Sequence, residues 1–151
     1  MPKSLPTSRR ALQAAVAATA LLPLVTGPLA YLRGGRAIAG AQEWDAPIES
    51  ELRHLSVWWF GAGLRLLGTV PKVEHEGPAL RQTLALMALG GVGRLLALRA
   101  KGRPHPLMLA ATGVEIVLPV VLVVWQRRVA RAIPSEEAPH HSSAATASSS
   151  R

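Results

Sequence analysis

Uncharged apolar residues gather in four long runs that short polar segments separate. The runs cover residues 11–32, 52–70, 79–98 and 107–125, and few charged residues interrupt them. Each run approaches the roughly 20 residues that a helix needs to cross about 30 Å of hydrocarbon. A backbone in lipid must satisfy its own hydrogen bonds, so runs of this length form helices. The pattern therefore predicts four transmembrane helices.

Prolines and glycines at the ends of the runs mark the boundaries of these helices. Pro71 follows the second run, Pro78 opens the third, and Gly102 ends it. Proline costs little in the first turn of a helix, and glycine favours its C-terminus. Asp45 can cap a second helix that starts before the membrane. The sequence thus predicts four helices, and their expected ranges are 11–32, 46–70, 79–99 and 107–131.

The segments outside the helices differ from them in composition. Residues 1–10 form a polar N-terminus on the cytoplasmic side, residues 11–133 hold the four-helix domain, and residues 134–151 form a Ser/Ala/Thr-rich tail. The tail has no large apolar residues to bury, so we expect it to be disordered. We expect its His140-His141 pair to be solvated. The predicted fold class is an all-α integral membrane four-helix bundle with a disordered C-terminal tail.

Composition and charge agree with a membrane protein and exclude several chemistries. The 151 residues are 49% hydrophobic and 17% charged, with a net charge of +8 and no cysteine. Without cysteine the chain forms no disulfide, thiolate zinc site or iron–sulfur cluster. Its basic residues are spread over both ends of the helices, unlike the footprint of a nucleic-acid-binding protein. We expect membrane lipids as partners, no nucleic acid, and no cofactor.

Four crossings place both termini on one side of the membrane. Eight Lys and Arg residues flank the helices on that side, and six flank them on the other. The positive-inside rule therefore favours a multi-pass protein of a bacterial inner membrane with both termini in the cytoplasm. Arg9 and Arg10 also partly resemble a twin-arginine export signal, with small-residue cleavage sites near Gly40. The apolar run is long for a signal peptide, so we expect the first helix to be retained.

Charged residues inside the spans point to specific partners. A charge at mid-membrane costs roughly 2.5–3.5 kcal/mol on insertion scales. Glu115 is the only acid in any apolar run, and Arg94 lies on the preceding helix. At 1.5 Å per residue, Arg94 lies about 10 Å and Glu115 about 13 Å from the same membrane face. An ion pair between them gives the lowest free-energy cost for the two charges, and Arg53 is a second candidate partner of Glu115.

Polar residues at the outer end of the bundle form a candidate cluster, which comprises Glu51, Arg53, His54, Arg94 and Glu115. Small residues share helix faces with these charges, which favours close packing with the charges turned inward. Three interpretations remain open for the cluster. It is an ion pair that fixes helix register, a cavity that binds a ligand, or a path for protons or ions.

Five short motifs follow one another along the chain: Glu51-Leu52-Arg53, Gly61-Ala62-Gly63, Gly93-Arg94-Leu95-Leu96, Gly102-Arg103-Pro104 and Glu115. In this order they resemble a bacterial membrane family catalogued as domain of unknown function 4345. The resemblance covers roughly residues 11–131 and implies four transmembrane helices, with no established activity. The chain departs from the pattern at His54, where an aromatic residue is expected, and at Ala97, where a serine is expected. The shape is also similar to four-helix proteins of the DoxX type, which are linked to quinone or redox partners.

Three functional hypotheses follow. The first is a non-catalytic membrane protein, a small subunit that packs against a larger membrane partner or a second copy. The alternative is a binding or transport protein for a lipid- or quinone-like small molecule, with an outer-leaflet Arg/Glu pocket. The third is an accessory to a redox enzyme in which Trp58 and Trp59 flank a quinone ring. The sequence favours a non-catalytic protein over an enzyme and offers no catalytic residue or metal ligand.

Overall fold

The chain folds into four α-helices, and the part described contains no strand. The structure is a computed structural model that describes residues 4–41 and 44–132. The elements are α1 (Ser4–Arg33), the short 3-10 helix η1 (Gly34–Ala37), α2 (Ala46–Thr69), α3 (Gly77–Lys101) and α4 (Pro106–Ala132). The predicted all-α, membrane-type four-helix bundle is thereby confirmed. The tail expected at residues 134–151, with His140 and His141, lies outside the described residues.

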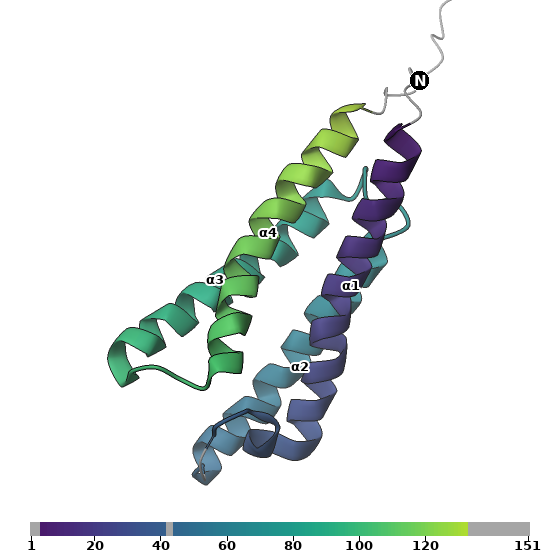
Figure 1. The fold of residues 1–151 in the computed structure, drawn as a ribbon. Helices are drawn as coiled ribbons and strands as arrows, with labels where there is room; N and C mark the ends of the chain where they lie inside the picture. The colour runs from purple at the N-terminus through teal and green to yellow at the C-terminus, as the bar shows by residue number, and fades with distance from the viewer. Residues whose placement is uncertain (1–3, 42–43, 133–151) are drawn as a thin grey trace, which may run out of the picture.

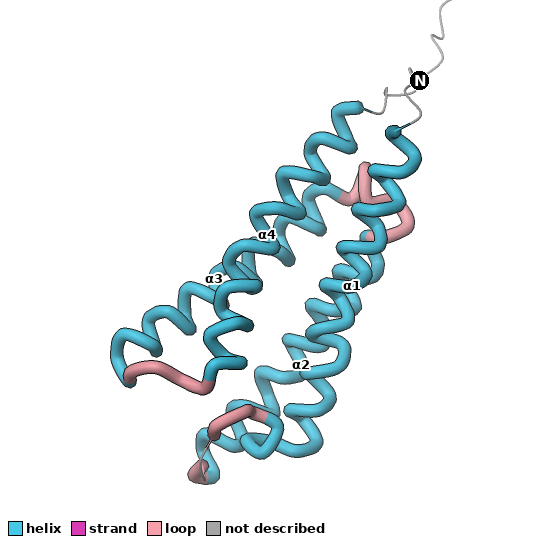
Figure 2. Tube along the Cα trace, viewed as in Figure 1, coloured by secondary structure: helices cyan, strands magenta, loops and turns pink. Residues whose placement is uncertain are grey.

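The helices form two antiparallel hairpins that meet at one end and separate toward the other (Figure 1, Figure 2). The first hairpin pairs α1 with α2, and the second pairs α3 with α4. We call the end with the start of α1, the α2–α3 turn and the end of α4 the termini end. The opposite end, with the α1–α2 and α3–α4 connections, is the loop end. There the end of α3 lies away from the first hairpin, while a Cβ built on Gly40 would lie 2.9 Å from the Cβ of His105.

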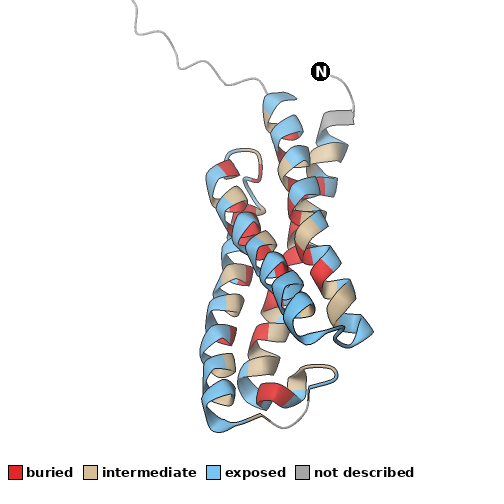
Figure 3. Cartoon of the chain, turned by 90° about the vertical axis from the view of Figure 1, so that its left-hand side faces the viewer, coloured by how far each residue is buried: buried red, intermediate tan, exposed pale blue. Residues whose placement is uncertain are grey.

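The buried apolar core lies in the half of the bundle near the termini end. All four helices and the α2–α3 turn contribute to it, with Leu12, Val16, Ala20, Leu66, Val73, Leu80, Leu84, Met87, Leu122 and Val129. Many other large apolar residues are exposed, and exposed residues are pale blue in Figure 3. Such an exterior suits lipid, whose tails are as apolar as leucine. The shared core ends before the loop end, where the end of α3 lies away from the first hairpin and the two connections approach each other at Gly40 and His105.

Helix α1 begins at Ser4, several residues before the start that the apolar run predicts. Its polar first turns are held by neighbouring segments. Arg9 donates from Nε and Nη2 to the two carboxylate oxygens of Glu74, both at 2.9 Å, and Trp125 Nε1 donates to Ser8 Oγ at 3.1 Å. From Ser4 onward the polar N-terminus is therefore part of the helix rather than a separate segment.

Two glycines allow α1 and α2 to approach closely. A Cβ built on Gly27 would lie 3.0 Å from both the carbonyl oxygen of Ser56 and the Cβ of Phe60. A Cβ built on Gly63 would lie 2.8 Å from Leu24 Cγ. A side chain at either position would force the neighbouring atoms of the other helix to shift. Small residues at a helix interface serve this purpose in membrane proteins.

Three of the helices are long and apolar enough to cross a membrane, in the stretches Pro6–Ala37, Gly77–Lys101 and Pro106–Ala132. Helix α2, which the sequence predicts as the second span, is not among them. It has 24 residues and packs along α1, but Arg53, His54 and Arg65 lower its apolarity. The fold is that of a membrane protein in which the first hairpin contains one strongly apolar helix and one more polar helix.

Candidate functional site

An arginine and a glutamate from facing helices form an ion pair inside the second hairpin. Arg94 on α3 donates from Nε to Glu115 Oε2 on α4, across 2.7 Å. The Glu115 side chain is only 5% exposed, whereas that of Arg94 is 44% exposed. The carboxylate is thus enclosed by protein while the guanidinium remains accessible. The two side chains that the depth argument singled out lie in direct contact.

Gly91 allows this ion pair to form because it lets α3 approach α4. A Cβ built on Gly91 would lie 2.7 Å from Ile116 Cγ1 and 3.2 Å from Glu115 Cβ. Gly90 and Gly93 on the same helix have no atom within 4 Å of an added Cβ. Among these three glycines, only Gly91 is required by the packing around the ion pair.

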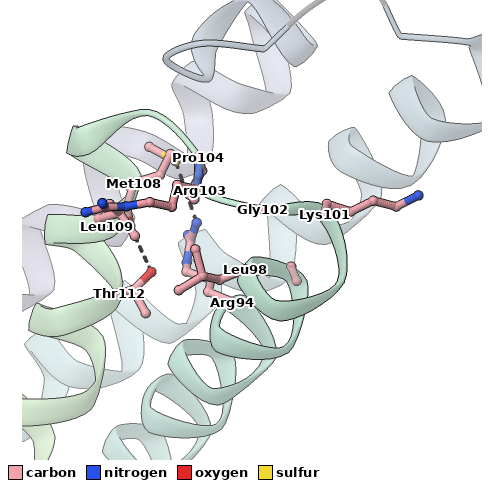
Figure 4. Close-up of a pocket in the computed structure, with 10 residues that line it drawn as sticks. Arg94, Leu98, Lys101, Gly102, Arg103, Pro104, Met108, Leu109 and Thr112 are labelled. Atoms are coloured by element: carbon pink, nitrogen blue, oxygen red, sulfur yellow. Dashed lines mark hydrogen bonds between the residues drawn. The ribbon is translucent and has the colours of Figure 1, made fainter.

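A cavity of about 270 Å³ lies between α3 and α4 on the loop-end side of the ion pair (Figure 4). Its lining comes from the end of α3, the connection and the start of α4, with Arg94, Ala97, Leu98, Lys101, Gly102, Arg103, Pro104, Met108, Leu109 and Thr112. Gly102 ends α3 with a positive φ of 87°, a conformation that favours glycine at helix C-termini. From there the chain crosses to α4 without helical structure, which leaves the two helix ends apart.

The lining of the cavity combines cationic and apolar side chains. Arg94 points between the helices toward Met108, whose sulfur accepts from Nη1 at 3.7 Å (Figure 4). Arg103 extends across α4 beside Leu109, and Lys101 points away from Arg94. Within the described residues, no acceptor binds Nη2 of Arg94. Since a guanidinium has five N–H donors, Arg94 can bind a further acceptor while it keeps Glu115.

The other three residues of the predicted cluster lie on α2, and the structure does not join them to this ion pair. Arg53 binds Glu49 instead of Glu115, with Nη2 2.6 Å from Oε1. His54 Nε2 accepts a hydrogen bond from Trp58 at 3.3 Å, and Glu51 is exposed. The expected cluster is therefore divided into two groups, one on each hairpin. The cavity lies on the hairpin that carries the ion pair.

Glu49 is a polar anchor that was not among the predicted site residues. Its Oε2 accepts from the backbone N–H of Gly35 at 2.9 Å, and its Oε1 accepts from Arg53. The hydrogen bond from Gly35, followed by those from Arg53, lowers the pKa of Glu49. The i,i+4 spacing of Glu49 and Arg53 is the sequence signal that could have revealed this pair. The anchor joins η1, which directly follows α1, to the start of α2.

A separate polar network lies at the termini end, outside the cavity. Gln126 on α4 donates to the carbonyl of Val73 at 3.3 Å and accepts from Arg81 on α3 at 3.4 Å. Burial raises the pKa of Glu74, but hydrogen bonds from Arg9 and from the backbone outweigh burial, so its pKa is lowered overall. This network connects α1, the α2–α3 turn and α4, and thus joins the two hairpins.

The comparison with protein families finds one match in this chain. A family model described as a domain of unknown function (DUF4345) matches residues 11–126. The matched range includes the ion pair, the whole cavity lining and the Glu49 anchor. No curated protein and no solved structure matches the chain.

Proposed function

The chain belongs to the DUF4345 family, and on this premise we propose that it is a non-catalytic membrane protein that binds a lipid-like small molecule between α3 and α4. The position of Arg94 carries the proposal. Its Nε holds the buried Glu115, while the rest of the guanidinium faces a cavity of about 270 Å³. Polar and ionisable groups inside a membrane protein are expensive, and they commonly mark ligand or ion pathways.

The size and lining of the cavity support an amphipathic ligand. Small-molecule sites usually enclose about 300–1,000 Å³, so this cavity suits one headgroup or ring rather than a large molecule. Leu98, Met108 and Leu109 offer apolar contacts, while Arg94 and Arg103 offer charge. The cavity lies at the end of the helices, where a membrane interface supplies molecules of this kind.

Filling the cavity tests the proposal. Ala97 lines it, so Ala97→Trp places a large ring inside. Ala100 is exposed on the same helix and does not line the cavity, so Ala100→Trp is the matched control. Native mass spectrometry of protein extracted with its lipids should show a bound molecule in wild type and Ala100→Trp, and its loss in Ala97→Trp. Equal retention in both variants would contradict the binding function.

An orientation with both termini in the cytoplasm of a bacterial inner membrane goes with this proposal. The excess of Lys and Arg at the termini end supports it. The cavity then lies in the outer leaflet. Because the chain has no cysteine, Ala41→Cys at the loop end can be labelled alone in intact cells. A membrane-impermeant maleimide should label it, and labelling that requires broken cells would contradict this orientation.

A second candidate function is that of a subunit in a larger membrane assembly. It is favoured by open space beside Gly90 and Gly93 on the outer face of α3, because small residues let membrane helices pack closely. Gly93→Leu should then reduce the amount of partner or second copy that co-purifies. Gly113→Leu on α4, where an added Cβ also meets nothing, is the control. Unchanged assembly in Gly93→Leu would exclude this face as the contact.

A further inference from the structure

We infer that the ligand of the cavity is an anionic amphiphile, whose headgroup binds Arg94 and Arg103 and whose chain extends into lipid. The inference rests on the proposed binding function and specifies the chemistry of the ligand. It is carried by the balance of charge around the cavity, by the free donors of Arg94 and by the apolar wall. Each of these observations concerns residues that line one space.

Positive charge is in excess around the cavity. Its lining contains Arg94, Lys101 and Arg103 and no acid, and the nearby carboxylate of Glu115 is already paired with Arg94. In the described part of the chain, neither Lys101 nor Arg103 forms an ion pair. Charges held near hydrocarbon are costly unless they are paired. An anion bound here neutralises part of this excess.

The guanidinium of Arg94 is oriented for an additional acceptor. Its Nε is fixed by Glu115, and its Nη1 contacts the sulfur of Met108, which is a weak acceptor. Nη2 has no acceptor among the described residues. An anionic oxygen is a stronger partner than a thioether, because charge-assisted hydrogen bonds are about twice as strong as neutral ones. Since Glu115 already orients the guanidinium, binding an anion costs little further ordering.

The position of the charges distinguishes a headgroup from a soluble anion. Arg103 lies in the connection at the loop end, where lipid headgroups gather, and Arg94 reaches toward it from about 10 Å deeper. Leu98 and Leu109 line the same space from the two helices. A headgroup between the two arginines therefore leaves its chain beside apolar side chains. A zwitterionic headgroup would bring its own cation against Arg103 and bind less well.

Charge variants on the full-length protein test this inference in lipid nanodiscs. Wild type should retain phosphatidylglycerol over phosphatidylcholine, measured by native mass spectrometry after release from discs that contain equal amounts of both. Arg103→Gln should weaken retention of phosphatidylglycerol about tenfold, the effect of losing one charge-assisted hydrogen bond. Arg99→Gln removes the same charge from an exposed position outside the cavity and should leave retention unchanged. Arg94 is not varied here because its loss would leave Glu115 buried and unpaired.

Three results would overturn the inference. The first is equal retention of the two lipids by wild type, and the second is an equal loss in Arg103→Gln and Arg99→Gln. The third is displacement of phosphatidylglycerol by an equal concentration of glycerol phosphate, since the ligand would then be a soluble anion. If either of the first two occurs while Ala97→Trp still removes bound lipid, the binding function stands and only the anionic headgroup is wrong; the third would also contradict a lipid-like ligand. If Ala97→Trp removes nothing, the binding function fails as well.

Discussion

The ion pair between Arg94 and Glu115 should respond unequally to the loss of each partner. Arg94→Gln leaves a carboxylate that is only 5% exposed without its cation. Glu115→Gln leaves a guanidinium that is 44% exposed and faces the cavity. The amide oxygen of the new glutamine can still accept from Arg94 Nε. We therefore expect Arg94→Gln to be the more destabilising change.

The magnitudes follow from the burial of the two side chains. Removing one partner from a buried ion pair lowers the free energy of unfolding by about 3–5 kcal/mol. We expect about 3 kcal/mol for Arg94→Gln, because the adjacent cavity is open to solvent. Glu115→Gln replaces a charge-assisted hydrogen bond with a neutral one, which costs about 1 kcal/mol. The double variant retains a neutral hydrogen bond between two amides. Its cost should lie about 2 kcal/mol below the sum of the single costs, within the range of coupling for residues in contact.

Reversible unfolding in mixed micelles of mild detergent and sodium dodecyl sulfate measures these free energies, with helical circular dichroism as the signal. Arg99→Gln serves as the control, because it removes an exposed charge that contacts neither residue. Equal costs of Glu115→Gln and Arg94→Gln would contradict the unequal burial of the two partners as the cause. Additive costs of the single changes in the double variant would show that the two side chains are uncoupled.

Two further predictions concern packing and pH. Gly91→Ala should destabilise the protein by about 1–2 kcal/mol, because the added Cβ would lie 2.7 Å from Ile116 Cγ1. Gly90→Ala should stabilise it by up to about 1 kcal/mol, because the added Cβ meets no atom and alanine favours the helix. The same unfolding assay compares the two variants, and equal effects would contradict close packing at Gly91. The lowered pKa of Glu74 adds stability above its unfolded pKa, and this stability is lost as the pH falls through the folded pKa. Thermal unfolding from pH 7 down to pH 3 should therefore show a smaller acid loss in Glu74→Gln than in wild type, and identical profiles would exclude the contribution of Arg9.

Much of the fold could be predicted from the sequence because lipid imposes strict rules. Long apolar runs and flanking prolines locate the helices, and Asp45 caps α2 as expected, accepting from Ile48 N at 3.3 Å. The contact of Arg94 with Glu115 could also be predicted, since Glu115 is the only acid in an apolar run and needs a cation at its own depth. The helix positions follow from apolar run length, and the contact follows from depth along each helix; both quantities can be counted directly from the sequence.

The composition of the cluster could not be predicted in the same way. Arg53 is a second candidate partner because it lies at the same end of the bundle as Glu115, but contact also depends on which helices face each other. The shared core ends before the loop end, where the end of α3 lies away from the first hairpin, and Arg53 binds Glu49 on its own helix. The cavity likewise depends on the path of the chain after Gly102, which has no periodic signal in the sequence.

The pairing of charges within each hairpin has a consequence for how the protein enters the membrane. Glu49 and Arg53 neutralise each other in the first hairpin, and Arg94 and Glu115 do so in the second. The ion pair of Arg9 with Glu74 joins α1 to the α2–α3 turn at the termini end. Each hairpin can thus enter the bilayer with the carboxylates of Glu49 and Glu115 already paired, while Arg65 and Arg81 bind the neutral amides of Gln82 and Gln126. Neither carboxylate needs a cation from the other hairpin, so insertion of each hairpin does not depend on association of the two.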